Sequence, residues 1–186
     1  MKAIDTELEG LKIIELDVFG DGRGRFFETY SAARYAAAGI EVTFVQDNVS
    51  VSQRGVLRGM HWQVGASAQA KLVSVLAGAV WDVVVDIRKG SPTFGKWKSI
   101  ELSAANGRQL FIPRGFAHGF LALEDNTIFS YKCDNYYDKA SELGFRFDDP
   151  EVGIAWPDVA GGYVLSPKDR VHPSFREACG KNRFHV

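Results

Sequence analysis

The feature that most constrains the fold of this chain is a regular alternation of short apolar segments with turn residues. Segments rich in Val, Ile, Phe and Tyr recur at short intervals, and Gly, Asn, Ser or Pro separates them. This punctuation is typical of an all-β sandwich or barrel. The expected strands are 11–18, 25–30, 43–52, 56–62, 71–77, 80–87, 97–102, 108–112, 115–123 and 127–133. Gly78 lies between two of these segments and suits a tight hairpin, because glycine adopts a positive φ without strain.

The rest of the chain predicts little regular structure. Ser31 can serve as the N-cap of a helix over AARYAAAG, and Gly39 can end that helix in the left-handed conformation. We expect this helix to be short and peripheral. Beyond Tyr136 the sequence is polar, punctuated by Pro and without a period, which indicates an irregular C-terminal tail. No flexible linker or repeat marks a boundary, so we expect a single domain over residues 1–186.

Composition narrows the class of protein and its partners. The chain has 22 Lys and Arg against 23 Asp and Glu, a net charge of -1, which provides no polycationic surface for a nucleic acid or an anionic membrane. Cys133 and Cys179 are too few for a disulfide framework, which indicates a reducing compartment. No segment has the pattern of a signal peptide, and Asp82 interrupts the most apolar stretch. We therefore expect a cytoplasmic protein without a membrane helix.

Two histidines on the expected strands are candidates for chemistry. Simple alternation places Arg58 and His61 on opposite faces of their strand, unless a bulge at Gly59 resets the register. A histidine such as His61, on an apolar face, is more often a hydrogen-bonded core residue than a catalytic one. His118 has small neighbours that leave room for a ligand, although a core role is equally compatible with the sequence. Lys71 opens a strand, a position that is usually solvated.

Other classes of site have weaker support. His172 and His185 lie in the irregular tail and no H-x-H pair exists, so a metal site of three histidines, or of two with a carboxylate, is the less favoured alternative. The sequence lacks a G-x-S-x-G elbow and a phosphate-binding glycine loop. Arg23 and Arg25, within FGDGRGRF, belong either to a plain turn or to a site that holds an anion.

Long motifs of the chain resemble those of a known family. They are FGDGRGRFFETY, FVQDNVSVSQRGVLRGMHWQ, AQAKLVSVLAGAVWDVVVDIRKGSPTFGKW, RQLFIPRGFAHGFLAL, YKCDNYYDKASELG, and WP followed by LSPKD. Together they resemble the dTDP-4-dehydrorhamnose 3,5-epimerases, deoxysugar-nucleotide epimerases of cupin fold, from about residue 11 to residue 168. Met60, Ala70 and Arg114 depart from the usual pattern of the family, and we assign no chemistry to them.

The resemblance implies an all-β, cupin-type jelly-roll barrel or sandwich that inverts carbons 3 and 5 of dTDP-4-dehydro-6-deoxy-D-glucose to give dTDP-4-dehydro-L-rhamnose. Both carbons flank the ketone, so proton loss gives an enolate, and inversion needs a base and an acid on opposite faces. The resemblance implies that His61 is the base, that Asp169 orients and stabilises its imidazole, and that Tyr131 is the acid. Lys71 would stabilise the oxyanion at carbon 4, with His118 as a second polar contact.

The resemblance also implies how the substrate is held and how the protein assembles. The residues implied to bind the nucleotide are Phe19, Arg23, Phe26, Glu28, Gln46, Asn48, Arg58, Tyr137, Glu142 and Lys168. Gln46 and Asn48 are two residues apart on a strand, so they face the same way and can bind the polar edge of a pyrimidine. A homodimer with exchanged strands is implied, and neither a metal nor another cofactor is required.

Three alternatives remain open from the sequence. An enzyme that epimerises carbon 3 alone needs the same acid and base, although the AHGF segment favours the double epimerase. A metal-dependent cupin enzyme would depend on a bound ion. A module that only binds a sugar nucleotide would not need His61, Lys71, Tyr131 and Asp169 together.

Overall fold

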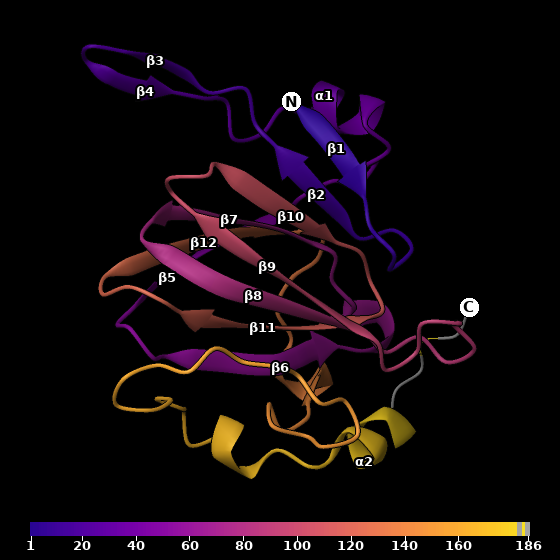
Figure 1. Cartoon of the computed structure of the whole chain (residues 1–186). Helices are drawn as coiled ribbons and strands as arrows, with labels where there is room; N and C mark the ends of the chain where they lie inside the picture. The colour runs from indigo at the N-terminus through magenta and orange to yellow at the C-terminus, as the bar shows by residue number, and fades with distance from the viewer. Residues whose placement is uncertain (182–183, 185–186) are drawn as a thin grey trace.

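The computed structural model describes residues 1–181 and 184, and two antiparallel β-sheets dominate them (Figure 1). In spatial order the six-stranded sheet contains β1 (Lys2–Asp5), β2 (Lys12–Glu15), β10 (Arg108–Ile112), β7 (Lys71–Ala77), β12 (Thr127–Cys133) and β5 (Gln46–Ser52). The five-stranded sheet contains β13 (Glu142–Gly144), β6 (Leu57–Gln63), β11 (Phe116–Ala122), β8 (Ala79–Asp86) and β9 (Trp97–Ser103). Neither sheet closes on itself, so the expected all-β, cupin-like architecture is confirmed as an open sandwich.

A main core and two outer apolar layers stabilise the sandwich. The main core joins residues of both sheets, including Val73 from β7, Val84 from β8 and Phe129 from β12. The tail then covers the outer face of the five-stranded sheet, where Phe145 and Phe175 are almost fully buried. Strand β8 is therefore covered on both faces, which explains its near-continuous apolar sequence. Figure 1 shows the tail, in orange to yellow, passing over the side of the molecule that β6 occupies.

The predicted helix is present but shorter, as α1 (Ala32–Ala37), and its Tyr35 packs into a third cluster on the outer side of the six-stranded sheet. Gly39 adopts the expected positive φ of 77°. Ser31 is the N-cap as predicted, and its carbonyl accepts a hydrogen bond from the Tyr35 N–H at 3.0 Å, although its side chain makes no capping bond. Gly78, with φ 74°, joins β7 to β8 as predicted.

The tail is less irregular than expected. It contains α2 (Phe175–Gly180), whose first turn is closed by a capping box between Ser174 and Glu177. The tail also contains the short 3-10 turns η2 (Lys139–Ser141) and η3 (Asp169–Val171), and a further one, η1 (Gly65–Ser67), connects β6 to β7. His185 lies outside the described residues. No helix in the described part of the chain is long and apolar enough to cross a membrane.

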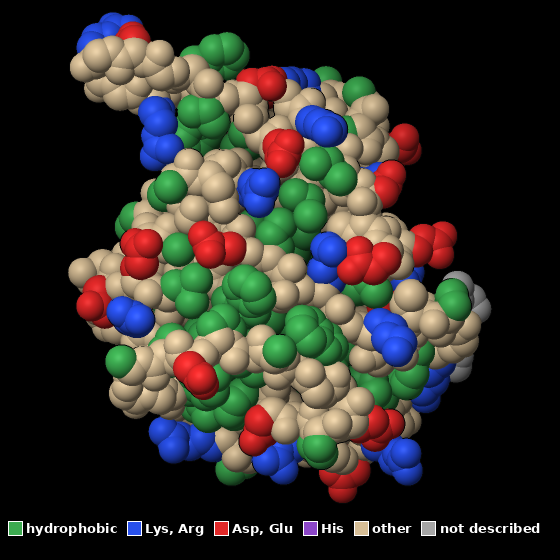
Figure 2. All heavy atoms as spheres, in the orientation of Figure 1, with side chains coloured by type: hydrophobic (Ala, Val, Ile, Leu, Met, Phe, Trp, Pro, Cys, Tyr) green, Lys and Arg blue, Asp and Glu red, His purple; other side chains and the backbone are tan. Residues whose placement is uncertain are grey.

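Strand boundaries differ from the expectation mainly near the N-terminus. The expected strand over 25–30 is instead the second half of a small hairpin, β3 (Phe19–Asp21) and β4 (Gly24–Phe26). All six residues of these two strands are exposed, so burial imposes no apolar alternation on them. The hairpin stands clear of the sandwich in Figure 1, and Figure 2 shows charged side chains at its tip.

Candidate active site

A β-bulge in β6 decides which side chains point between the sheets. His61 pairs with His118, whereas Arg58 pairs with Phe120, so β6 has one residue more than β11 over this stretch. Arg58 and His61 consequently line the same cavity, which is the alternative that a bulge at Gly59 predicted. A Cβ on Gly59 would lie 2.6 Å from the Cα of Gly119, and only glycine fits this close approach. The space beside Gly119 is filled by β6, because a Cβ there would meet the Met60 Sδ at 2.7 Å.

The cavity lies between the two sheets and has a volume of about 250 Å³. Its lining includes all four residues implied as catalytic and also Ser50, Arg58, His118, Gly119, Phe120, Phe129, Ser166 and Lys168. An adjoining cavity of about 450 Å³ shares His61, Lys71 and Tyr131 with it. His61 comes from the five-stranded sheet, whereas Lys71 and Tyr131 come from the six-stranded sheet. Groups on the two sheets can therefore approach a ligand from opposite sides.

His61 forms a buried pair with Asp169. The His61 Nε2 lies 2.5 Å from the Asp169 Oδ1, and the Ser166 hydroxyl donates to the other carboxylate oxygen at 2.7 Å. Burial lowers the pKa of His61, although the Asp169 carboxylate opposes this effect. Burial alone would raise the pKa of Asp169, but contacts with His172, His61 and Ser166 outweigh it and lower that pKa. The pair therefore favours a neutral imidazole beside a carboxylate.

Lys71 and Tyr131 form the opposite side of the cavity. The Lys71 Nζ lies 5.8 Å from the centre of the Tyr131 ring. Burial lowers the pKa of Lys71, and no carboxylate among the described residues forms an ion pair with it. Burial also raises the pKa of Tyr131, so its hydroxyl keeps its proton at neutral pH and can donate it.

A second histidine–carboxylate pair lies in the wall of the cavity. The His118 Nε2 is 2.9 Å from Asp82 Oδ2, and both residues are buried. Burial raises the pKa of Asp82, and its contacts with His118 oppose this rise. From the sequence, Asp82 is only an interruption of an apolar stretch. A carboxylate in the middle of an otherwise apolar segment was the feature that could have identified it.

Four of the residues implied to bind the nucleotide line the adjoining cavity: Gln46, Asn48, Tyr137 and Glu142. Gln46 and Asn48 do face the same way, and their side chains are hydrogen-bonded at 3.1 Å. Glu142 accepts hydrogen bonds from Tyr137 at 3.1 Å and from Lys168 at 2.8 Å. These side chains form a polar wall that leads away from His61.

Four of the implied binding residues are not brought to the cavity within one chain. Phe19 and Phe26, on the hairpin, are 65% and 72% exposed. Arg23 binds Asp21 of the same hairpin at 2.6 Å, and Glu28 accepts a bond from Arg34 at 3.1 Å. Within a single chain, therefore, the hairpin residues do not line the cavity.

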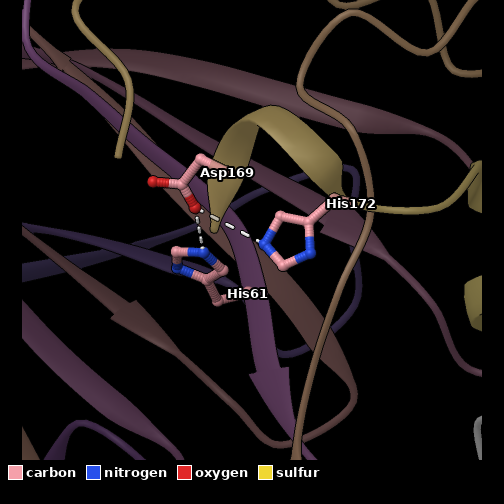
Figure 3. A group of neighbouring side chains, drawn as sticks. All are labelled: His61, Asp169 and His172. Carbon is pink, nitrogen blue, oxygen red and sulfur yellow. Dashed lines mark hydrogen bonds and ion pairs between the residues drawn. The ribbon is translucent and has the colours of Figure 1, made fainter. Parts of the chain in front are cut away.

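His172 is a neighbour of the site that the sequence analysis missed. Its ring centre lies 5.2 Å from that of His61, and its Nε2 lies 3.4 Å from the Asp169 Oδ1 (Figure 3). Its place in the irregular tail separates it in the sequence from the histidines of the strands. Turn η3 places it there because the tail folds back over β6.

A sandwich whose cavity holds a buried imidazole–carboxylate pair, a phenol and an amine defines a cupin-like enzyme with groups suited to proton transfer. A family model for dTDP-4-dehydrorhamnose 3,5-epimerase matches residues 5–177. The chain belongs to the dTDP-4-dehydrorhamnose 3,5-epimerase family, and it is an isomerase.

Individual relatives agree with this assignment. The 3,5-epimerase of Methanothermobacter thermautotrophicus is 49% identical over 175 residues, which cover 94% of each chain. That of Escherichia coli is 50% identical over 170 residues, 91% of each chain. A crystal structure of dTDP-6-deoxy-D-glucose-3,5-epimerase from Legionella pneumophila in complex with dTDP-4-keto-L-rhamnose has a TM-score of 0.90 at 50% identity, covering 94% of this chain and 93% of that one.

Proposed function

We propose that this chain inverts carbons 3 and 5 of dTDP-4-dehydro-6-deoxy-D-glucose and so produces dTDP-4-dehydro-L-rhamnose. The observation that carries the proposal is the position of the His61–Asp169 pair, which shares one cavity with Lys71 and Tyr131 on the facing sheet. Family membership and the ligand of the Legionella relative support the choice of substrate.

His61 acts as the base in this proposal. Because its Nε2 lies against the Asp169 carboxylate, the stable tautomer carries its proton on Nε2 and leaves a lone pair on Nδ1. That lone pair removes the proton from carbon 3 or carbon 5. Asp169 then stabilises the imidazolium that forms, so it is a positioning residue that acts through His61.

The opposite sheet completes the reaction. Proton loss places negative charge on the oxygen at carbon 4, and the Lys71 ammonium stabilises it. Tyr131 then donates a proton to the other face of the carbon, which inverts its configuration. His118, held by Asp82, adds a polar contact in the wall. After each inversion His61 carries the extra proton and Tyr131 lacks one, and exchange with solvent returns both groups to their starting states.

Substrate binding extends along the polar wall. Arg58 lines the cavity, and the one hydrogen bond that its side chain makes within the described residues is a long one of 3.4 Å to Ser52, which leaves most of its donors for the diphosphate. Gln46 and Asn48 bind the pyrimidine, and Tyr137, Glu142 and Lys168 border the sugar and the base.

We also propose a homodimer in which hairpins are exchanged. The β3–β4 hairpin projects from the sandwich with two exposed phenylalanines, a surface that a lone protein rarely leaves uncovered. At the edge of the six-stranded sheet, Val49 and Val51 of β5 are 62% and 59% exposed. Pairing of two copies would cover these surfaces and bring Phe19, Arg23, Phe26 and Glu28 to the partner's cavity.

The test is to incubate the protein with dTDP-4-dehydro-6-deoxy-D-glucose in deuterated water and to count the exchanged positions. Deuterium at carbons 3 and 5, with both inverted, is expected. Exchange and inversion at carbon 3 alone would assign the chain to the 3-epimerases, and absence of exchange would leave only a binding module. Turnover should survive exhaustive chelation, and its loss with EDTA and recovery with one divalent ion would favour the metal-dependent cupin instead.

A further inference from the structure

Three metal-ligating atoms converge beside the cavity. They are His61 Nε2, Asp169 Oδ1 and His172 Nε2, and all lie within 4.8 Å of one another (Figure 3). His61 comes from β6, whereas the other two come from η3 and the residue that follows it. We call these three residues the His–Asp–His cluster.

The one polar contact given for the His172 Nε2 among the described residues is a long one, with Asp169. Its Nε2 is buried and makes no hydrogen bond, although Asp169 Oδ1 is 3.4 Å away. The side chain is 11% exposed. Its position depends on Gly144, because a Cβ there would lie 2.5 Å from the His172 Cε1. A buried nitrogen without a hydrogen bond, beside a carboxylate and a second imidazole, is an arrangement that a metal ion would satisfy.

We propose that the His–Asp–His cluster binds a divalent transition-metal ion of the Zn²⁺ class, and that the bound ion inhibits the enzyme. Two imidazoles and one carboxylate are a donor set that Zn²⁺ accepts, with ligand bonds of about 2.0–2.2 Å. Such bonds in a tetrahedron separate the donor atoms by about 3.3–3.6 Å. The 3.4 Å between His172 and Asp169 already fits this spacing. The 2.5 Å between His61 and Asp169 must lengthen, so the ion replaces the hydrogen bond between them.

The inhibition follows from the tautomer of His61, and this part of the inference rests on the proposed function. A metal ion on Nε2 uses the lone pair of that atom, so the proton held there moves to Nδ1 and none is lost. Nδ1 then has no lone pair with which to remove a proton from the substrate. The ion blocks the base without occupying the position of the sugar, and its fourth ligand is water from the cavity.

The charges around the cluster are compatible with a cation. Asp169 and Glu142 both lie close enough to His61 to act on its charge, and each favours a positive ion. The Lys168 ammonium disfavours a bound cation, but it is paired with Glu142 at 2.8 Å. The His61 side chain is 21% exposed and lines both cavities, so an ion can reach it from solvent.

The test uses the full chain with Co²⁺ as a spectroscopic probe and Zn²⁺ as the inhibitor. We expect one Co²⁺ per chain with the absorption of a tetrahedral site, and a loss of turnover with buffered free Zn²⁺ that EDTA reverses. His172→Phe keeps the ring and removes its nitrogens. Measured against its own turnover without metal, this variant should bind Zn²⁺ more weakly by more than the roughly 10–100-fold that loss of an outer-sphere partner costs.

Two controls keep the result specific. Cys133→Ser tests the thiol that lines the adjoining cavity, and it should leave Zn²⁺ inhibition unchanged. His172→Asn, compared with His172→Phe by thermal melting, guards against a misfolded variant. Equal inhibition of His172→Phe and the unmodified chain, or loss of inhibition in Cys133→Ser, would overturn the proposal. If the unmodified chain binds Co²⁺ in a way that depends on His172 but has no epimerase activity, the metal site is supported and the proposed function is rejected.

Discussion

At the scale of residues, His61 is subject to two opposing effects on its protonation. Burial lowers its pKa, and the Asp169 carboxylate raises it again. Because the base must be neutral, kcat/KM should fall as pH decreases through the pKa of His61. That pKa lies below the ordinary value of about 6.5, so activity should be lost only in acid solution.

Asp169→Asn separates these two effects. Without the Asp169 carboxylate, burial and Lys168 still lower the pKa of His61 and only the weaker effect of Glu142 raises it, so the acid limb of kcat/KM against pH should move to lower pH. The maximal rate should fall as well, because an amide does not select the tautomer with Nδ1 free. Profiles between pH 4.5 and 8 for the two proteins provide the measurement. A limb that moves to higher pH would mean that the carboxylate does not stabilise the imidazolium.

The proposed roles of His61 as base and Tyr131 as acid predict different results for a variant of each residue. His61→Ala should abolish solvent deuterium exchange at carbons 3 and 5, because no proton is removed. Tyr131→Phe keeps the base, so exchange with retention should persist while inversion falls by about 10²–10⁴-fold, the usual contribution of a positioned acid. Proton NMR in deuterated water measures both. Exchange near the normal rate in His61→Ala would show that another group is the base.

At the scale of elements, the β6 bulge predicts a large effect of a small substitution. Gly59 has φ 137°, and a Cβ would lie 2.6 Å from the backbone of Gly119. Gly59→Ala should therefore destabilise the protein by about 3 kcal/mol or more, through backbone strain and strand displacement. Gly65→Ala is the matched control, since φ is 63° and nothing lies within 4 Å of the added carbon, so about 1 kcal/mol is expected. Urea unfolding compares them, and equal losses would exclude the steric argument.

Individual strands and helices show which parts of the fold the sequence could predict. Strands β7, β10 and β12 have the predicted bounds because each is a largely apolar segment limited by Gly, Asn or Pro at one end or both. Strand β1 was missed because its burial is partial at a sheet edge, and α2 because its single capping box was not used. Within the site, His61 and Asp169 are 108 residues apart, so no local pattern connects them. Resemblance to the family connected those two, whereas Asp82 and His172 entered only with the tertiary structure.

At the scale of the whole molecule, the separation of hairpin and cavity suggests that one chain does not form a complete site. If Arg23 binds the diphosphate of the partner's substrate, Arg23→Ala should raise KM more than it lowers kcat, since the contact acts alike on substrate and transition state. Light scattering should detect a dimer of the unmodified chain. A monomer with full activity would contradict the exchange of hairpins.

Mixing two defective variants distinguishes a site completed by the partner's hairpin from a site formed within one chain. His61→Ala lacks the base but keeps a normal hairpin, whereas Arg23→Ala keeps the base and lacks the hairpin cation. In a mixed dimer with exchanged hairpins, one cavity combines the normal His61 of one chain with the normal Arg23 of the other, and the second cavity carries both defects. Activity at low substrate concentration should therefore exceed that of either variant alone after the two are unfolded and refolded together. If each hairpin serves its own chain, every cavity keeps one defect and mixing restores nothing. Refolding each variant separately before mixing is the control, because dimers that do not exchange chains should show only the sum of the two activities.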